Sequence, residues 1–485
     1  MANASPVCGS LTTIAESSEN TMVTLNNSRV IIIGAGPTGL GSAWRLRELG
    51  FENWQIFEQE AYVGGLAASF IDNAGFVWDI GGHVQFSHYS YFDRLMHVLL
   101  RDEWLSHERE SWIWMRDRFI PYPFQNNIRH LPEREMKDCL TGLIRACLTN
   151  PTNPPANFDV WLQRQFGEGM AEHFLRPYNF KVWAYPTRDL NYRWIGERVA
   201  KVDLERVVLN IIESRDDVSW GPNSMFRFPL RGGTGAVWNE LAARLPSERI
   251  VLGKRLTNVE AKKKALYFED GSREEYDFLI STAPLDWIVQ NSDLSDLVCT
   301  SKSLMHSSTH VVGVGLKGEP PPHLEKKCWM YFPEDNSPFY RATVFSNYSP
   351  NNVPDIRQYW SLMLEVAESP VKQVDRERLI DSVINGLIAT RLIENRNEIA
   401  NVWHHRVEYG YPTPSLRRDE ALNQLLPALE QYGIFSRGRF GAWKYEVSNQ
   451  DHSVMQGVEI ADRLVCDSEE PTLNNPDIVN SRGSK

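Results

Sequence analysis

The chain has 485 residues, of which 42% are hydrophobic, 11% aromatic and 23% charged. This composition is typical of a folded globular protein, and the length favours two or three domains. The net charge of −11 argues against general binding to nucleic acids or anionic membrane surfaces, although local arginines can still hold a small anionic ligand.

The six cysteines are scattered without CxxC pairs, which favours a reducing compartment over a disulfide scaffold or a zinc site. The first residues have no basic start and no long apolar run, so we expect no secretory signal. The chain contains no apolar stretch long enough for a membrane span. We therefore expect a cytoplasmic protein, with residues 1–28 as a disordered polar tail.

Residues 29–49 predict a buried strand, a glycine turn and a helix. In the pattern Gly34-x-Gly36-x-x-Gly39, the glycines permit a sharp turn, a close approach of a pyrophosphate to the backbone, and tight packing of helix on strand. A second strand ends at Glu58, where a carboxylate can bind ribose hydroxyls. Strand, turn, helix and acid in this order predict a dinucleotide site.

A glycine-rich loop containing Gly64 and Gly65 follows the second strand, where nicotinamide dehydrogenases usually continue directly into a helix. The loop favours FAD as the dinucleotide. A strand, glycine turn and helix over residues 226–245, two strands around the turn at 269–271, and a loop and helix over 437–465 read as later segments of the same domain. The nucleotide domain is therefore expected to be discontinuous.

Two insertions separate these segments. Residues 128–218 have helical periodicity, and residues 301–409 alternate as in an antiparallel sheet. We expect an α/β protein in which a Rossmann-like FAD-binding domain carries an inserted helical domain and an antiparallel sheet domain. The expected bounds are 29–108, 229–300 and 410–470 for the FAD-binding domain, 128–218 for a helical substrate and oligomerisation domain, 109–127, 219–228 and 301–409 for the sheet domain, and 471–485 for a C-terminal tail.

The stretch FVWDIGGHVQFSHY, residues 76–89, predicts neither a helix nor an ordinary strand. Its glycine pair, Gly81 and Gly82, precedes His83. Two interpretations are open: a tight turn that holds a core histidine, or a backbone that leaves room for a flat cofactor.

Eight motifs occur in order along the chain: GGHVQFSHY, PYPFQNN, RPYNFKVW, WGPNSMFRFP, CWMYFPEDN, FYRATVFSNYS, GYPTP and GRFGAWKYEVSNQDHS. Together they resemble the UDP-galactopyranose mutases, specifically the eukaryotic branch, from about residue 29 to about residue 480. The resemblance implies a three-domain FAD enzyme that interconverts UDP-galactopyranose and UDP-galactofuranose without net redox change. It also implies that the flavin is active as FADH− and that NADPH is the reductant.

In the mechanism that the resemblance implies, N5 of the reduced flavin attacks the anomeric carbon and UDP leaves. An iminium intermediate then allows the ring to contract, and the product supplies galactofuranose for glycoconjugates. The protein must stabilise a departing diphosphate, for which arginines with bidentate reach are suited.

The resemblance also assigns residues. It implies His83, Arg198 and Arg341 as catalytic residues, with His83 facing the flavin and the arginines holding the diphosphate. The implied substrate-binding residues are Gln125, Phe174, Asn179, Trp183, Asn223, Trp329, Tyr331, Tyr411, Tyr445 and Asn449. The implied cofactor-binding residues are Gly34, Gly36, Pro37, Thr38, Gly39, Glu58, Gly64, Gly65, Leu66, Gly81, Gly82, His83, Arg439, Asn449, Gln450 and Ser453.

Several alternatives stay open. Phe174 and Trp183 fit equally a helical core, and a lone arginine such as Arg341 fits a surface ion pair. A net-redox flavoenzyme of the amine-oxidase or desaturase type and an inactive nucleotide-sugar binder are the rival functions. We expect no metal site, since His404 and His405 are adjacent and would point to opposite faces of a strand. The sequence leaves open whether the chain forms a homo-oligomer.

Overall fold

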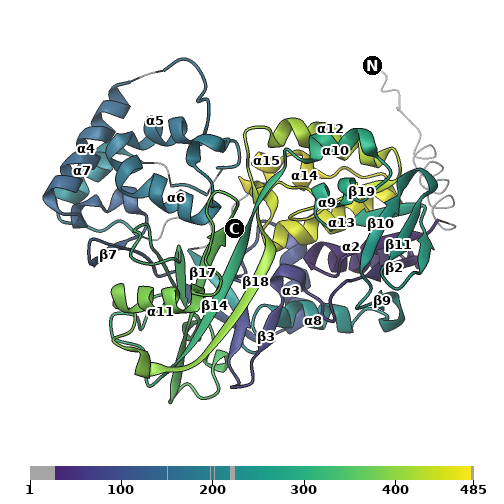
Figure 1. Ribbon diagram of the computed structural model, residues 1–485, viewed down its shortest axis with the longest axis horizontal. Coiled ribbons are helices and arrows are strands. Elements are labelled where there is room, and N and C mark those ends of the chain that lie inside the picture. The colour runs from purple at the N-terminus through teal and green to yellow at the C-terminus, as the bar shows by residue number, and fades with distance from the viewer. Residues whose placement is uncertain (1–27, 150, 197, 201, 219–223, 482–485) are drawn as a thin grey trace, which may run out of the picture.

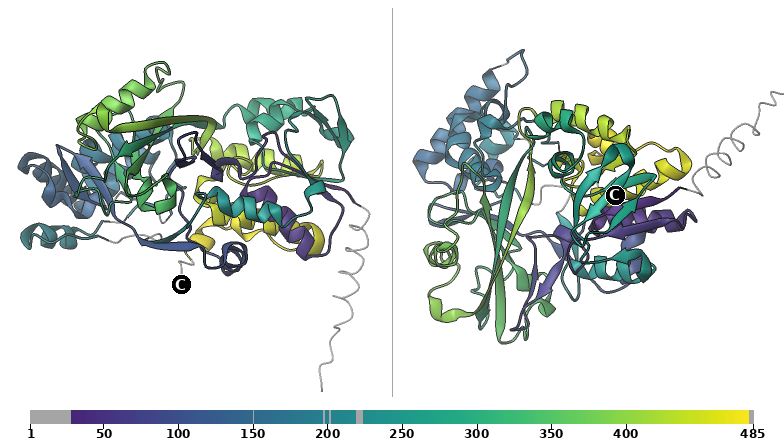
Figure 2. Two further views of the ribbon diagram at one scale, coloured as in Figure 1. Left: turned by 90° about the horizontal axis from the view of Figure 1, so that it is seen from below. Right: turned by 45° about the vertical axis from the view of Figure 1, so that its right-hand side comes forward.

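The computed structural model describes residues 28–149, 151–196, 198–200, 202–218 and 224–481. These residues form two lobes that lie side by side, with the long strands β14 (Met305–Lys317) and β18 (Ile399–Thr413) running between them (Figures 1 and 2). Most of the tail expected at 1–28, and the expected site residue Asn223, lie outside the described residues. No helix among the described residues is long and apolar enough to cross a membrane.

One lobe is built on a five-stranded sheet in the order β19-β13-β1-β2-β9, and all its pairings are parallel. Its strands come from three separate parts of the chain and are β1 (Val30–Ile33), β2 (Trp54–Phe57), β9 (Ile250–Val251), β13 (Phe278–Ser281) and β19 (Ile434–Ser436). This confirms the expected discontinuous Rossmann-like arrangement.

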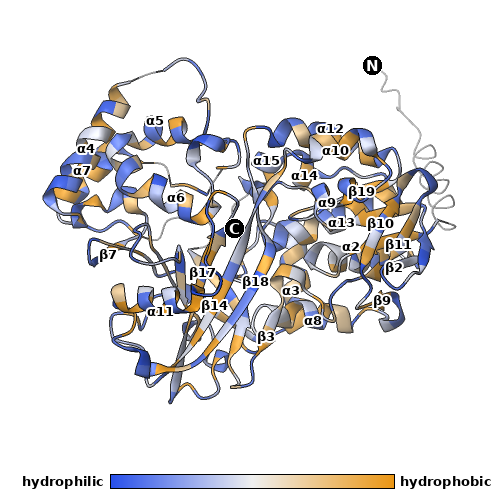
Figure 3. Ribbon diagram, viewed as in Figure 1, coloured by the Kyte–Doolittle hydropathy of each residue, from blue (hydrophilic) through white to orange (hydrophobic). Residues whose placement is uncertain are grey.

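Both faces of this sheet are buried. Val30 and Ile32 belong to one hydrophobic cluster, while Ile31 and Ile33 belong to another. Successive side chains of a strand point to opposite faces, so an uninterrupted apolar run is what a doubly covered parallel strand requires. Figure 3 shows hydrophobic residues in the region of β2 and, outside this sheet, of the strand β11 (Ala265–Phe268).

Helices α2 (Pro37–Glu48), α3 (Ser90–Leu100), α8 (Gly235–Ala243) and α13 (Gln450–Cys466) pack in this lobe. Helix α13 lies directly against α2. A Cβ atom at Gly457 would lie 2.2 Å from the carbonyl oxygen of Thr38, so the close approach of the two helices requires glycine there. The last helix is thus positioned by the helix that follows the glycine turn.

The second lobe contains a seven-stranded sheet in the order β18-β14-β17-β16-β15-β6-β7. The strands are β6 (Ser111–Met115), β7 (Arg118–Pro121), β14 (Met305–Lys317), β15 (Trp329–Tyr331), β16 (Arg341–Val344), β17 (Tyr359–Glu368) and β18 (Ile399–Thr413). One pairing, β6 with β15, is parallel and departs from the expected antiparallel pattern. These strands lie far apart in sequence, so no tight hairpin forces them to run in opposite directions.

The helical part of this lobe comprises α4 (Glu133–Leu148), α5 (Phe158–Met170), a π-turn (Ala171–Leu175), α6 (Arg176–Trp183) and α7 (Leu204–Ile212). Gly167 interrupts α5 with φ of 78°, and a Cβ atom there would lie 2.2 Å from the carbonyl carbon of Gly142 in α4. The bend and the contact between α4 and α5 therefore both depend on glycine.

The remaining elements join and cover the lobes. They are β3 (Ser69–Ile71), β4 (Val77–Asp79), β5 (Trp104–Glu108), β8 (Met225–Pro229), β10 (Leu256–Glu260), β11 (Ala265–Phe268), β12 (Arg273–Glu275), α9 (Leu285–Gln290), α10 (Val298–Ser301), α11 (Leu379–Ala389), α12 (Arg418–Glu430), α14 (Pro471–Asn474) and α15 (Pro476–Asn480). Three features differ from expectation. Strands β10, β11 and β12 form a sheet where two strands were expected, β18 continues past the boundary expected at 409, and the expected C-terminal tail contains α14 and α15.

Candidate active site

The glycine turn between β1 and α2 has the geometry that its pattern predicts. Gly34 has φ of 99°, a left-handed conformation that other residues rarely adopt. A Cβ atom at Gly39 would lie 1.9 Å from the carbonyl oxygen of Gly34, so the helix packs on the strand only with glycine at that position. Pro37 and Thr38 begin α2 directly after the turn.

The loop after β2 returns to this turn, as expected. The backbone N–H of Gly64 donates to the carbonyl of Ala35 at 2.9 Å, and a Cβ atom at Gly65 would lie 3.4 Å from Cα of Gly36. Leu66 follows in the same short 3₁₀ helix (Gly65–Ala67). The glycines of the two segments form one cradle.

Glu58 lies at the end of β2 beside the cradle and is 7% exposed. Its carboxylate accepts hydrogen bonds from the backbone N–H groups of Ala35 at 2.7 Å and Glu60 at 2.9 Å. Burial raises the pKa of Glu58, while these N–H groups act in the opposite direction. The acid is thus held at the position expected for a ribose partner, with its orientation set by backbone.

The glycine pair before His83 forms a tight turn that β17 supports. Gly81 has φ of 95°, and the N–H of Gly82 donates to Oε1 of Glu365 at 3.0 Å. Nδ1 of His83 is buried and has no hydrogen-bond partner among the described residues. Burial lowers the pKa of His83 to about 4, so the imidazole is neutral near pH 7. A satisfied core histidine would have a partner for this nitrogen.

Arg341, on β16, lies directly across from Glu365 on β17. Its Nε and Nη2 atoms donate to the two carboxylate oxygens, each at 2.7 Å, and the hydroxyl of Tyr340 donates to Oε2 of Glu365 at 2.7 Å. Arg341 is therefore ion-paired, but the pair is not the surface ion pair of the alternative interpretation, because Glu365 is only 2% exposed.

Arg198 contrasts with Arg341. Both of its Nη atoms are buried and lack hydrogen-bond partners in the part of the chain that the structure describes. Its guanidinium carbon lies 5.1 Å from the ring centroid of Tyr445, within cation–π range. A buried cation without a carboxylate partner is costly unless a ligand supplies the negative charge.

A third arginine completes the group. Arg439 donates to the carbonyl of Gly410 and to Oγ of Ser448, and its guanidinium lies 4.9 Å from the ring of Tyr411. Burial lowers the pKa of Arg439, and the charge of Arg198 acts in the same direction. The two arginines are thus close enough to repel each other, which concentrates positive potential around the tyrosines.

Aromatic residues surround the arginines. Tyr411 and Tyr445 lie with ring centroids 5.8 Å apart, and Trp183 lies 4.9 Å from Tyr445. Trp329 and Tyr331, on β15, contact each other through the indole N–H and the hydroxyl. The structure thus brings together most of the substrate-binding residues expected from the sequence.

Four expected substrate residues are also engaged elsewhere. Phe174 and Trp183 are buried members of the helical core, so the alternative that they serve packing holds at least in part. Nε2 of Gln125 donates to the carbonyl of Ala200 at 2.7 Å, and Nδ2 of Asn179 donates to Leu175 at 2.7 Å. Each amide retains its oxygen for another partner.

The start of α13 carries the last group of expected residues. Asn449 is the N-cap residue, and its side chain makes no capping hydrogen bond. Oε1 of Gln450 accepts from Gln85 and Trp238, while its Nε2 is buried without a partner among the described residues. Ser453 is buried in the first turn. Unsatisfied donors at a helix N-terminus favour an anionic or carbonyl-bearing ligand.

Sequence reasoning missed several residues of this site. Glu365, Tyr340 and Tyr178 contact or approach Arg341, and Arg109 lies over the rings of Tyr122 and Trp329. Glu365 had a detectable signal, because it is a lone carboxylate in the otherwise apolar stretch SLMLEVA. Tyr178 lies in the motif RPYNFKVW, from which only Asn179 and Trp183 were assigned.

One cluster was not expected from the sequence. His88, Asp451 and His452 are all buried, and their ligand atoms lie within 4.8 Å of one another. Asp451 already accepts hydrogen bonds from the backbone and from Nδ1 of His88, at 3.0 and 2.7 Å. We describe it as a hydrogen-bonded cluster under the start of α13.

A discontinuous parallel sheet with a glycine cradle, joined to a second lobe across a site with buried unpaired polar groups, defines a flavoprotein of the two-lobed oxidoreductase class. The family model of flavin containing amine oxidoreductases matches residues 37–315. The crystal structure of a reduced UDP-galactopyranose mutase is similar to this chain, with 50% identity, 94% of this chain and 98% of that chain covered, and a TM-score of 0.91. The chain belongs to the flavin containing amine oxidoreductases and, within them, to the UDP-galactopyranose mutases.

Other relatives are more distant. Protoporphyrinogen oxidase 2 of Arabidopsis thaliana is 20% identical over 311 residues, which cover 54% of this chain and 58% of that protein. A putative protoporphyrinogen oxidase from Exiguobacterium sp. 255-15 has a TM-score of 0.70 at 16% identity, covering 91% of this chain and 99% of that chain, and shares the fold. The resemblance found in the sequence motifs is thus confirmed at the level of the mutases, while the comparisons do not test the eukaryotic branch.

Proposed function

We propose that the chain is an FAD-dependent isomerase that interconverts UDP-galactopyranose and UDP-galactofuranose with no net redox change. The observation that carries this proposal is the guanidinium of Arg198, buried without a carboxylate partner among the described residues, beside a second arginine and two tyrosines. A net-redox reaction on an amine or a hydrocarbon has no need for such a cationic site, whereas a leaving diphosphate does.

The residues present fit an FAD. Gly36 and Gly65 bring two backbone segments together with no side chain between them: a Cβ atom at Gly36 would lie 3.9 Å from Cα of Gly65. Glu58 stands beside this cradle for the ribose. The turn at Gly81–His83 and the start of α13 offer unpaired polar atoms, Nδ1 of His83 and Nε2 of Gln450, toward the flavin end. When bound and reduced, the flavin supplies a nucleophilic nitrogen for covalent catalysis at the sugar.

The chain's own residues perform three tasks. Arg198 and Arg341 bind the diphosphate and stabilise the charge that grows as UDP departs. Tyr411 and Tyr445 add hydroxyl donors, and burial raises the pKa of Tyr411, so this hydroxyl keeps its proton at neutral pH. Trp183, Trp329 and Tyr331 enclose the sugar and uridine and exclude water that would hydrolyse an activated sugar.

His83 acts as a neutral group in this proposal. With a pKa of about 4 it cannot serve as a cation near pH 7. It positions the turn against the cofactor and presents one ring nitrogen as acceptor or donor according to tautomer. Asn179, Phe174 and Gln125 hold the uridine and sugar, and Arg439, Asn449, Gln450 and Ser453 hold the flavin end.

Further parts of the proposal rest on the sequence alone. They are reduction by NADPH, membership of the eukaryotic branch and location in the cytoplasm. The domain bounds given above and a substrate and oligomerisation role for the helical insertion belong to the same group.

The test is anaerobic incubation of the purified holoenzyme with UDP-galactofuranose, with and without dithionite, followed by chromatography. We expect UDP-galactopyranose only after reduction, with the flavin still reduced at the end. A fully reduced flavin without conversion contradicts the mutase. In the arm without dithionite, reduction of the oxidised flavin by one equivalent of the substrate, which would itself be oxidised, would favour the amine-oxidase or desaturase class instead.

A further inference from the structure

We propose that Lys181 is a positioning residue that sets the spacing between the uridine side and the diphosphate side of the substrate site. It fastens helix α6 to the loop between β15 and β16, residues 332–340. The inference rests on the proposed function, because it takes Asn179 on α6 as a uridine contact and Arg341 on β16 as a diphosphate ligand. A ligand that spans both sides should therefore need Lys181, whereas a ligand that occupies one side should not.

The ammonium of Lys181 joins two elements that are distant in sequence. Its Nζ donates to the carbonyl oxygens of Glu334 and Ser337, each at 2.8 Å. Both acceptors belong to the hairpin loop that connects the end of β15 to the start of β16. At the base of this loop, Tyr331 and Arg341 lie directly opposite each other. One side chain of α6 is thus bonded to the loop that carries both site strands.

One face of α6 packs against this hairpin. Tyr178 and Lys181 lie three positions apart and therefore on the same face of the helix. The ring centroid of Tyr178 lies 5.3 Å from that of Tyr331 on β15, and the ammonium bonds to the loop that follows. Asn179 and Trp183, the residues assigned to the substrate, lie four positions apart on a neighbouring face. A contact between rings is weakly directional, whereas two hydrogen bonds to carbonyls set the position of the helix along the hairpin.

The sheet lobe holds the loop without the help of α6. Arg116, in the turn between β6 and β7, donates to the carboxylate of Glu334 from its backbone N–H at 3.1 Å and from Nη1 at 2.6 Å. Helix α11 packs closely against the loop, since a Cβ atom at Gly386 would lie 3.0 Å from Cβ of Ser337. Because the loop is fixed in these ways, the bonds of Lys181 locate α6 relative to the loop.

The burial of Lys181 argues for a specific role. The residue is 5% exposed, and lysines are seldom so deeply buried. Its acceptors are neutral carbonyls, because the carboxylate of Glu334 pairs with Arg116. Burial lowers the pKa of Lys181 to about 7, and the charge of Lys372 acts in the same direction. Asp335 and Glu334 act against this shift. An apolar side chain would avoid the desolvation of an ammonium, so the two hydrogen bonds are what a lysine adds at this position.

The experiment compares a ligand that spans the site with ligands that occupy one side. The affinities of the dithionite-reduced holoenzyme for UDP, uridine and pyrophosphate are measured by direct or displacement calorimetry at pH 6, below the pKa of Lys181. In Lys181→Met we expect UDP to bind about 10-fold more weakly, because its two ends no longer fit both sides at once. Uridine and pyrophosphate should each bind within about 2-fold of the wild-type affinity, since each uses one side only.

Arg116→Met is the matched control. It removes a cation that bonds to the same loop from the sheet lobe, and its side chain is 42% exposed. Helix α11 still holds the loop in this variant, so all three affinities should stay at their wild-type values. Two results would overturn the inference: a loss of UDP affinity in Arg116→Met equal to that in Lys181→Met, or a loss in Lys181→Met that UDP and the two fragments share equally.

Lys181→Gln keeps the test decisive if Lys181→Met does not fold. Its amide can donate, but the side chain is shorter than that of lysine and reaches at most one of the two carbonyls. We expect UDP to bind at least about 3-fold more weakly, as for one lost hydrogen bond, with both fragments unchanged. Undiminished UDP affinity in this variant would count against the positioning role.

The two proposals fail separately, because these titrations need no turnover. A loss specific to UDP in an enzyme that does not convert the sugar would contradict the mutase and leave the role of Lys181 standing. Conversion by the wild-type enzyme, together with an equal loss for all three ligands in Lys181→Met, would support the mutase and overturn the inference.

Discussion

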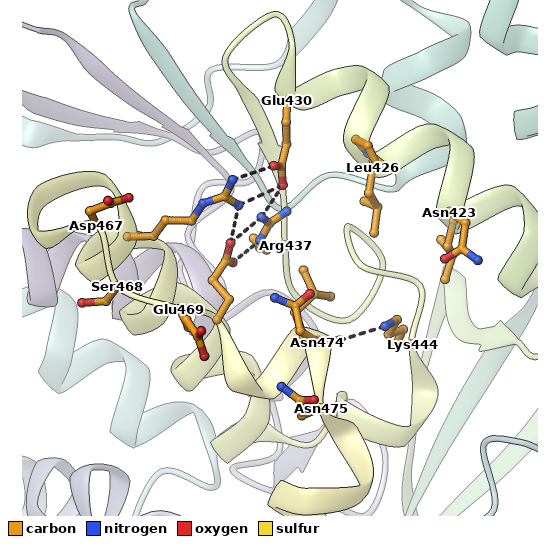
Figure 4. Close-up of a pocket in the computed structure, with 15 residues that line it drawn as sticks. Asn423, Leu426, Glu430, Arg437, Lys444, Asp467, Ser468, Glu469, Asn474 and Asn475 are labelled. Atoms are coloured by element: carbon orange, nitrogen blue, oxygen red, sulfur yellow. Dashed lines mark hydrogen bonds and ion pairs between the residues drawn. The ribbon is translucent and has the colours of Figure 1, made fainter.

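Two regions of the molecule bury arginines in opposite ways. Beside α12, α13 and α14 a polar pocket of about 780 Å³ is lined by residues of both charges (Figure 4). There Arg437, with a side chain 0% exposed, donates to both oxygens of Glu470 and to Glu430. In the diphosphate clamp, the proposed site formed by Arg198 and Arg341, Arg198 has two buried Nη atoms without partners among the described residues.

The difference separates a structural charge from one reserved for a ligand. Arg463 adds further bonds to Glu470 and Glu430, so the charges in the pocket compensate one another without an outside ion. Beside the clamp, Arg439 brings a further positive charge toward Arg198. A buried ion-pair network in which every charge is compensated stabilises the fold. A buried arginine without an anionic partner instead favours the binding of an anionic ligand.

Arg437→Met tests the structural side and should have the largest effect. Removing this arginine leaves Glu470, 1% exposed, with part of its charge uncompensated. We expect the free energy of unfolding to fall by about 3 to 5 kcal/mol, measured by denaturant titration. Turnover per folded holoenzyme should stay at the wild-type value below the transition.

Arg463→Met is the control. The Arg463 side chain is 38% exposed, so its loss should lower the free energy of unfolding by only about 1 kcal/mol. An equally stable Arg437→Met variant would contradict the distinction.

Arg198→Met tests the ligand side. We expect kcat/KM to fall by about 10²- to 10³-fold, because a charge-assisted contact to the leaving diphosphate is lost. The melting temperature should stay the same or rise, since an unpaired buried cation is removed. Arg193→Met is the control: that side chain is 72% exposed, on the same segment, and should leave turnover unchanged. A variant that loses stability and keeps its activity would reverse the assignment.

Glu459→Gln sharpens the comparison with a buried acid that has neither an arginine partner nor a ligand role. Burial raises the pKa of Glu459 to about 7, and Glu470 and Asp462 act in the same direction, although Thr472 donates to it. The folded protein therefore binds a proton that the unfolded chain releases near pH 4.5. The stabilisation from this proton is full below pH 4.5 and is lost as the pH rises through 7.

Glutamine imitates the protonated acid, so the variant should not lose this stabilisation. We expect it to exceed wild type by about 2 kcal/mol in free energy of unfolding at pH 8 and to match it at pH 4. The measurement is the difference between the two denaturation midpoints across this range. A difference that does not change with pH would place the proton elsewhere.

Local spacing predicted the nucleotide cradle well. Gly34, Gly39 and Glu58 lie within one βαβ unit, where strand, turn and helix fix the distances, and the structure places them as expected. The strands of the second lobe were likewise visible in their alternation. The parallel pairing of β6 with β15 was not, because no local signal sets the direction of strands that are distant in sequence.

The clamp was only partly predictable. The motif FYRAT identified Arg341, but its partner Glu365 depends on the register between β16 and β17, which the sequence does not reveal. The contact of His88 with Asp451 spans 363 positions and required the packing of α13 on α2. Gln125 and Asn179 were assigned from motifs, and their amides also donate to backbone carbonyls. The contact of Asn179 with Leu175 is local, whereas that of Gln125 with Ala200 spans 75 positions and depends on the fold.

Tyr411→Phe tests a single hydroxyl group of the proposed ligand site, and we expect it to have the smallest effect of these variants. The ring stays in place beneath the guanidinium of Arg439, 4.9 Å away, so the packing and the cation–π contact survive. Only the hydroxyl is lost, and we expect UDP to bind about 3- to 10-fold more weakly, as for one hydrogen bond.

Tyr276→Phe is the matched control, since that buried hydroxyl has no partner among the described residues and lies in the core beneath the parallel sheet. It should leave UDP affinity unchanged and the protein no less stable, because its removal relieves an unsatisfied polar group. If both variants weakened UDP binding alike, the loss would not come from a contact between the Tyr411 hydroxyl and UDP, and the assignment of Tyr411 to the diphosphate site would be wrong.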